Sequence, residues 1–185
     1  MATGVYKDTV IVTRLSEVRA LDGKCATEIL PGTLVTAKGD LSKTNSFVYV
    51  PDVKNHTFTP ATADTVRGLC IVLNAEEDEL RNVRERGKTG RKSVADPFPP
   101  NEQIRADILK AGAEYTFIID DSVTGAVVPG TLLKPGANGK LVLAATPVAG
   151  TPGNEMFTAI ESLAAGEGLG TGANKDLRRI ACRVL

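Results

Sequence analysis

Few side chains in this sequence have the type and spacing needed for acid–base chemistry. The one histidine, His56, lies in the polar stretch PDVKNHTFTPATAD, which we interpret as a loop with no nucleophile pattern beside it. Asp120 and Asp121 are adjacent at the end of an expected strand, where neighbouring side chains point to opposite faces. That geometry suits a turn cap better than a shared proton or a metal ion. The sequence therefore predicts no catalytic residue and no metal ligand.

Two glycine-rich stretches could in principle cradle a phosphate group. GEGLGTGANKD at 166–176 holds glycines at Gly-x-Gly-x-x-Gly-like spacing, and GKTG at 87–90 matches part of a phosphate loop. Neither stretch follows a buried strand and opens a helix, and the full Gly-x-x-x-x-Gly-Lys-Ser/Thr pattern is absent. Flexible loops are the better interpretation, so no cofactor is expected.

Three cysteines, Cys25, Cys70 and Cys182, are odd in number and far apart. They form no Cys-x-x-Cys pair, and with His56 they match no standard zinc spacing. We expect three buried thiols in a chain made in a reducing cytoplasm. The N-terminus lacks the pattern of a signal peptide, and no apolar run approaches the roughly 20 residues that span a bilayer, so no membrane partner is expected.

Charged residues balance overall but are concentrated in one segment. The chain has 22 acidic and 22 basic residues, whereas a protein that binds duplex nucleic acid usually carries a basic excess, so no direct nucleic-acid partner is expected. Within 74–105 an acidic cluster at 76–79 precedes a basic cluster at 81–92. This order favours a short helix ending near Gly87, and the low apolar content argues against a core helix. A long polar excursion in a compact domain is usually either functional or disordered, and both a solvated face and a protein-contact arm fit this segment better than nucleic-acid binding does.

Short apolar runs separated by Gly and Pro turns predict a mainly β fold. The strands are expected within 5–14, 46–52, 65–74, 114–121, 140–145 and 178–185. The runs at 65–74, 114–121 and 140–145 have the pattern of strands buried on both faces. The stretch EMFTAIESLAA fits either a short helix or a strand from Phe157 to Ile160. We expect one β domain over 1–185, a barrel or sandwich, with an N-terminal arm (1–8), a charged loop (75–104) and at most one or two short helices.

The tetrapeptide Pro-Gly-Thr-Leu occurs twice, at 31–34 and 129–132. Proline fixes φ at the first corner of a turn and glycine supplies the positive φ at the second, so each copy predicts a turn that launches a strand. After the second copy, LLKPGANGKLVLA predicts a hairpin. A generic turn used twice and an internal structural repeat both fit this pattern.

Taken together, residues 105–185 resemble the C-terminal part of tailed-bacteriophage capsid decoration (cement) proteins. The resemblance rests on GAEYTFIIDDSVTGAVVPGTLLKPGANGKLVLAA, FTAIESLAAGEG and the terminal RRIACRVL, and ILPGTLVTAKGD and VRGLCIVLNAEED fit the earlier half. It implies a non-enzymatic β-barrel or β-tulip domain on the exterior of a virion capsid, where it stabilises contacts between capsomers. The implied partners are the major capsid protein and other copies of the chain, as trimers more often than dimers. Residues 75–105 depart from the family by being longer and more charged.

Contacts with the shell or between subunits are then expected from the N-terminal arm and the charged excursion. The candidate residues are Tyr6, Lys7, Glu77, Glu79, Arg81, Arg84, Arg86, Lys88, Arg91 and Lys92. Two other functions fit less well. One is a tail-tube or head–tail joining subunit, and the other is a small carboxylate-dependent enzyme or ligand-binding β-barrel.

Overall fold

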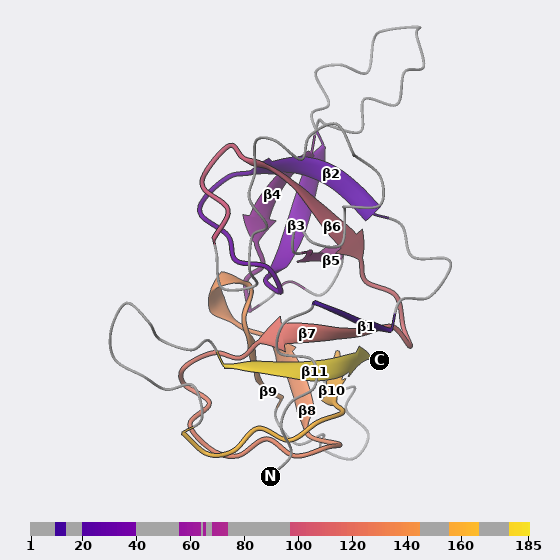
Figure 1. Ribbon diagram of the computed structural model, residues 1–185, viewed down its shortest axis with the longest axis vertical. Coiled ribbons are helices and arrows are strands. Elements are labelled where there is room, and N and C mark those ends of the chain that lie inside the picture. The colour runs from indigo at the N-terminus through magenta and orange to yellow at the C-terminus, as the bar shows by residue number, and fades with distance from the viewer. Residues whose placement is uncertain are drawn as a thin grey trace, which may run out of the picture.

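The computed structural model describes residues 10–13, 20–39, 56–63, 65, 68–73, 97–144, 156–166 and 178–185. These residues form two β lobes stacked along the long axis of the molecule (Figure 1). The first lobe is a closed barrel with the strand order β2-β4-β3-β5-β6. The second lobe is a six-stranded sheet with the order β1-β7-β11-β10-β8-β9. The prediction of a mainly β fold with a barrel is confirmed.

The strands are short, as the spacing of the turns predicts. The first lobe contains β2 (Ala20–Cys25), β3 (Leu34–Gly39), β4 (His56–Pro60), β5 (Leu69–Val72) and β6 (Gln103–Ile108). The second lobe contains β1 (Ile11–Thr13), β7 (Glu114–Ile118), β8 (Leu132–Pro135), β9 (Leu141–Leu143), β10 (Phe157–Ala159) and β11 (Arg179–Val184). A 3-10 turn, η3 (Ala137–Gly139), joins β8 to β9 and completes the predicted hairpin.

Most expected strands that fall on described residues are present. All four residues of β5 are buried, β7 and β11 form where predicted, and the stretch from Phe157 is a strand and not a helix. Two expectations are wrong. Residues 140–145 were expected to be buried on both faces, but Leu143 in β9 is exposed because β9 is the last strand of the sheet order. His56 was expected in a loop, but it is the first residue of β4, where it pairs with Gly23 and Gly39.

Other expectations concern residues that the structure does not describe. The strand within 46–52, the arm at 1–8, the glycine-rich stretch at 167–176 and the helix in the charged clusters all lie outside the described residues. At its far end, the charged loop expected over 75–104 overlaps regular structure, since β6 begins at Gln103.

The two lobes repeat one arrangement of five strands. β2, β3, β4, β5 and β6 correspond, in chain order, to β7, β8, β9, β10 and β11. The antiparallel registers agree residue for residue, as in the matching pairs Leu34↔Ile71 with Leu132↔Thr158, Val72↔Ala106 with Ala159↔Cys182, Gly23↔Ile104 with Phe117↔Ile180, and Val35↔Pro60 with Leu133↔Leu143.

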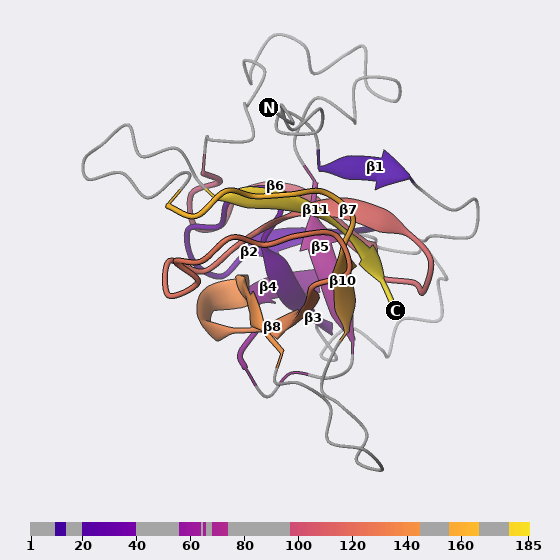
Figure 2. The ribbon, with the colours of Figure 1, turned by 90° about the horizontal axis from the view of Figure 1, so that it is seen from below.

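The closure of the barrel is repeated as well. In the first lobe β2 and β4 pair in parallel, with Cys25 opposite Phe58. In the second lobe the matching residues, Ile119 and Leu141, form a parallel bridge that joins β9 to the end of β7. The six-stranded sheet therefore curls back on itself as the barrel does, with β1 added at the outer edge beside β7 (Figure 2).

The two Pro-Gly-Thr-Leu turns occupy the same place in each lobe. Thr33 N–H donates to the Leu30 carbonyl at 3.2 Å, and Thr131 N–H donates to the Val128 carbonyl at 3.0 Å. Both glycines have a positive φ, 82° at Gly32 and 88° at Gly130, and β3 and β8 begin directly after the turns. The prediction of a turn that launches a strand is confirmed, and of the two interpretations the internal structural repeat is the one found.

The cores of the lobes correspond too. Nine residues of the first core occupy positions whose counterparts all lie in the second core, and the pairs are Cys25/Ile119, Ile29/Val127, Val35/Leu133, Phe58/Leu141, Cys70/Phe157, Val72/Ala159, Phe98/Leu163, Ile104/Ile180 and Ala106/Cys182. The two residues of a pair share their apolar character and in most cases nothing more, because a core tolerates changes of side chain as long as its volume is filled.

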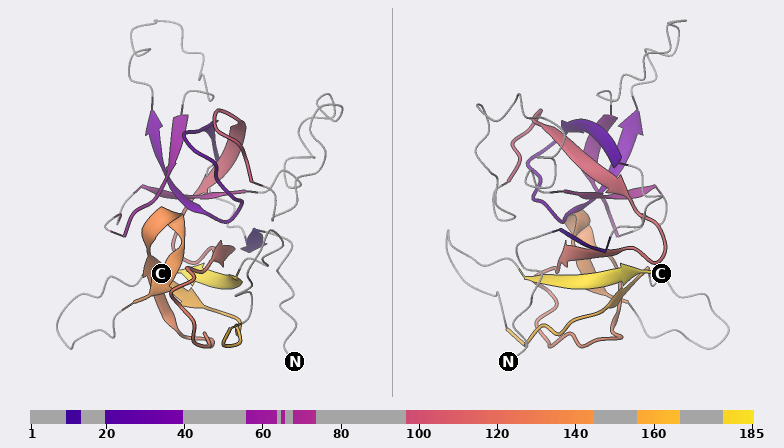
Figure 3. Two further views of the ribbon diagram at one scale, coloured as in Figure 1. Left: turned by 90° about the vertical axis from the view of Figure 1, so that its left-hand side faces the viewer. Right: turned by 45° about the vertical axis from the view of Figure 1, so that its right-hand side comes forward.

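The lobes also pack against each other. Leu34, Ile71 and Leu73 face outward from the first lobe and are buried in the core cluster of the second. At the junction the hairpin tip between β8 and β9 reaches the first lobe, where Gly139 N–H donates to the Ala61 carbonyl at 2.8 Å (Figure 3). Tyr115 Oη donates to the buried Asp107 carboxylate of β6 at 3.1 Å.

Candidate functional site

None of the ten contact residues predicted from the sequence lies within the described residues. They are Tyr6, Lys7, Glu77, Glu79, Arg81, Arg84, Arg86, Lys88, Arg91 and Lys92. The predicted turn cap is present, since Asp120 Oδ1 accepts a hydrogen bond from Ser122 N–H at 3.0 Å. Asp121 is exposed in the same turn.

The three cysteines are free and buried, as expected. Burial, together with the negative charge of Asp107, raises the pKa of the Cys70 thiol to about 11. Burial, with Glu161 nearby, also raises the pKa of the Cys182 thiol. Both thiols stay protonated at neutral pH and pack as small apolar groups.

Two buried arginines were not anticipated from the sequence. The Arg178 guanidinium donates to the carbonyl oxygens of Val123, Gly125 and Ala164, which ties two loops to the start of β11. Arg179 donates to the Pro31 carbonyl at 2.9 Å, and burial lowers its pKa to about 10. Both side chains therefore stabilise the fold by binding backbone carbonyl groups of other segments. Adjacent arginines before an apolar strand carry no signal that distinguishes them from a solvated pair.

Because the lobes repeat, the outward face of one can be compared with the same face of the other. In the first lobe five outward side chains are buried, and they come from the start of β3, from β5 and the residue after it, and from the residue that follows β4: Leu34, Leu69, Ile71, Leu73 and Ala61. Their counterparts in the second lobe are all half-buried: Leu132, Ala144, Met156, Thr158 and Ile160. We call these five residues the second-lobe face.

Three large apolar side chains in the described part of the chain are exposed, and all belong to the second lobe. Val128 is 56% exposed, Leu143 is 48% exposed and Leu185 is 53% exposed. Their counterparts in the first lobe, Leu30, Pro60 and Leu109, are half-buried. The second lobe thus exposes apolar surface at positions where the first lobe covers it.

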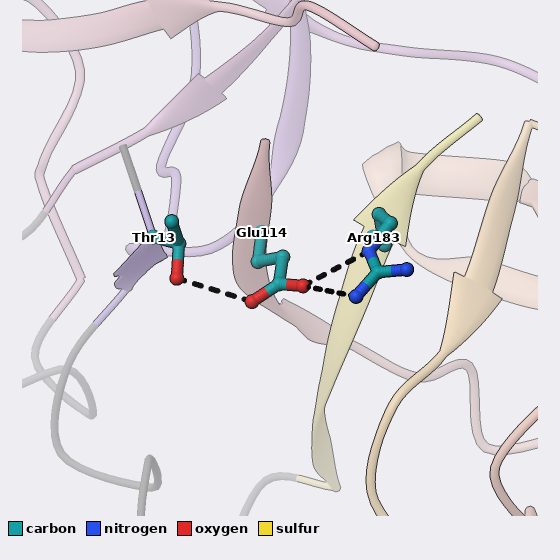
Figure 4. A network of polar contacts seen from close by, with 3 residues as sticks. All are labelled: Thr13, Glu114 and Arg183. Carbon is teal, nitrogen blue, oxygen red and sulfur yellow. Dashed lines mark hydrogen bonds and ion pairs between the residues drawn. The ribbon is translucent and has the colours of Figure 1, made fainter. Parts of the chain in front are cut away.

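A polar network borders the second-lobe face (Figure 4). Arg183 lies opposite Thr158 in the register of β10 and β11. Its Nε and Nη2 atoms donate to Glu114 Oε1 at 2.9 and 2.8 Å, and Thr13 Oγ1 donates to Glu114 Oε2 at 3.1 Å. The Arg183 side chain is 54% exposed, so the ion pair itself adds about 0–1 kcal/mol of stability.

The position matching Arg183 in the first lobe is Asp107, which is fully buried and accepts the hydrogen bond from Tyr115 of the second lobe. The same row of the sheet therefore contacts another lobe in one repeat and remains partly exposed in the other. A mainly apolar surface with a polar and charged border is common in protein–protein interfaces.

The sequence alone did not reveal this face. Leu132 and Ile160 have the pattern of core residues in apolar strands, and Arg183 that of an isolated surface charge. The difference in burial between equivalent positions appears only when the two lobes are compared.

The described residues contain neither a cluster of potential metal ligands nor a membrane-spanning helix. No three His, Cys, Asp or Glu side chains among them gather where they could hold a metal ion. In the same part of the chain, no helix has the length and apolar character needed to cross a membrane.

The chain was compared with known families, curated proteins and solved structures. No family model matches it, and neither does any curated protein. Among solved structures it is similar to the N-terminal base of the head fiber protein gp8.5 of bacteriophage phi29, with 7% sequence identity and a TM-score of 0.48. That likeness covers 91% of this chain and 94% of the other.

Proposed function

We propose that this chain is a non-catalytic structural protein of a bacteriophage virion, which binds the outside of the capsid and stabilises contacts between capsomers. The observation that carries the proposal is the repeated β unit built around the two Pro-Gly-Thr-Leu turns. The sequence resemblance to capsid decoration proteins rests on these turns and on the strands that follow them. A rigid β frame with an apolar outward face supports a role in protein contacts.

The polar side chains of the frame support the same proposal. Asp120 caps a turn, Asp107 and Tyr115 join the lobes, and Arg178 and Arg179 bind backbone carbonyl groups. Each is engaged within the chain, in a role that holds the frame together.

We propose further that the charged segment after β5 contacts the shell. In the second lobe only Glu161 and Ser162 lie between Ile160 and the bridge residue Leu163. In the first lobe residues 74–97 lie between Leu73 and Phe98, which forms the matching bridge with Ile29. Since the repeat closes without such a segment, the β frame does not require it. Its opposite charges would set the register of docking.

The test is co-sedimentation of the purified chain with expanded, empty heads of the phage that carries its gene. Saturable binding and a raised melting temperature of the shell are expected. Deleting residues 76–92 should abolish or weaken binding while the far-UV circular dichroism spectrum of the frame is kept. In a second pair of variants, Arg81, Arg84 and Arg86 are replaced by glutamate or, as the matched control that retains charge, by lysine.

Unchanged shell occupancy after the deletion would refute the role of the segment. Failure of the wild-type chain to bind the shell, together with hexameric rings or filaments of the chain alone, would refute the decoration function and favour a tail-tube or head–tail joining subunit.

A further inference from the structure

The contact between the two lobes shows what this type of face binds. In the first lobe, Leu34 and Ile71 lie side by side on β3 and β5 and are fully buried against the second lobe. Asp107 continues the row on β6 and is bound by Tyr115. The partner of this face is therefore another β lobe of the same construction.

The corresponding row of the second lobe keeps the features of that contact. Leu132 lies beside Thr158 on β8 and β10, and Thr158 lies beside Arg183 on β11. Met156 and Ile160 extend the apolar part along β10, and Leu185 N–H binds the Met156 carbonyl at 2.9 Å, which places an exposed leucine next to it. This row has no lobe covering it within the described residues.

We propose that the second-lobe face is a self-association surface and that its occupant is another copy of this chain. The lobe repeat supports this choice of occupant, because the equivalent face of the first lobe is already covered by a lobe of this chain. The inference does not depend on capsid binding, since it concerns contacts between copies in solution.

The charges beside the face are self-complementary. Glu114 and Arg183 lie next to each other at its border, where the Arg183 side chain is 54% exposed and the Glu114 side chain is 16% exposed. When two copies meet across this face, the arginine of one can reach the glutamate of the other, as a symmetric contact requires. The chain also has no net charge, so there is little long-range repulsion between copies.

The experiment is sedimentation velocity across a concentration series, with Thr158→Glu as the test variant. The new carboxylate lies at the centre of the face and opposite Arg183, a neighbour that it can pair with in the folded chain. Thr57→Glu is the matched control. Thr57 is an exposed residue of β4 whose register partners are Lys24 and Lys38, so its carboxylate also faces cations but on the first lobe.

The wild-type chain should form oligomers, the Thr57→Glu variant should match it, and Thr158→Glu should raise the dissociation constant at least about tenfold, which corresponds to about 1.4 kcal/mol. A monomeric wild-type chain would overturn the proposal, even if the chain binds phage shells. Equal association of the two variants would overturn it as well.

A second variant covers the case in which Thr158→Glu fails to fold. Thr158 is half-buried, so the new thiol in Thr158→Cys is partly exposed, whereas the native cysteines are buried. A short bismaleimide should then crosslink copies of this variant and leave Thr57→Cys uncrosslinked. Crosslinking of neither variant, or of both equally, would contradict an interface at the second-lobe face.

Discussion

The repeated turn offers a matched pair of substitutions that measures the contact between the lobes. Gly32 and Gly130 occupy the same corner of the same turn, with φ of 82° and 88°. A Cβ atom at Gly130 would meet nothing within 4 Å. A Cβ atom at Gly32 would lie 2.8 Å from Arg179 Nη1 and 3.0 Å from the Thr116 carbonyl oxygen, both in the second lobe.

The expected cost of each alanine follows from these surroundings. A left-handed conformation costs an L-residue roughly 1–2 kcal/mol, which applies to Gly32→Ala and Gly130→Ala alike. At Gly32 the methyl group must also displace the Arg179 guanidinium, which donates to the Pro31 carbonyl at 2.9 Å. A hydrogen bond from a charged group contributes about 1.5–3 kcal/mol. We therefore expect about 1–2 kcal/mol for Gly130→Ala and about 2.5–5 kcal/mol for Gly32→Ala.

Urea unfolding followed by far-UV circular dichroism measures both values, provided that the wild-type chain and the variants share one m-value. The difference between the two free energies of unfolding should be about 1.5–3 kcal/mol, because the backbone term cancels. Equal losses within about 0.5 kcal/mol would refute the reasoning, since they would mean that the turn at Gly32 does not press against the second lobe.

Three further predictions concern buried polar groups and thiols. Tyr115→Phe removes the hydroxyl that binds Asp107 at 3.1 Å and should lower the free energy of unfolding by about 1–3 kcal/mol in urea titrations. Arg178→Met removes the donors to three loop carbonyls; limited proteolysis should then cut within 120–130 faster than in the wild-type chain, and unchanged protection would contradict its role. Folding raises the pKa of Cys70 from 9.0 to about 11. The stability that depends on its protonated thiol is therefore fully present below pH 9 and is lost as the pH rises through 11. The unfolding free energy should fall there by up to about 1.4 kcal/mol per pH unit for this thiol, and Cys70→Ala should reduce that slope.

Features that depend on neighbouring residues could be predicted from the sequence. The strand from Leu69, the terminal strand with Cys182 facing the core, and the cap at Asp120 follow from side-chain alternation and turn chemistry, which act over a few residues. The Pro-Gly-Thr-Leu turns were predicted for the same reason, since proline and glycine fix the backbone locally wherever they occur.

Only the tertiary structure shows which side chains are covered by another part of the chain. Phe58 and Leu141, or Cys70 and Phe157, fill equivalent core positions without resembling each other, because packing requires apolar volume and not a given residue. The two turns left the repeat as one of two interpretations, and the strand registers established it. Likewise, Leu34 and Leu132 are the same residue after the same turn, yet Leu34 is buried and Leu132 half-buried, because among the described residues only Leu34 has another lobe packed against it. Burial of that kind depends on long-range contacts, which no local pattern in the sequence records.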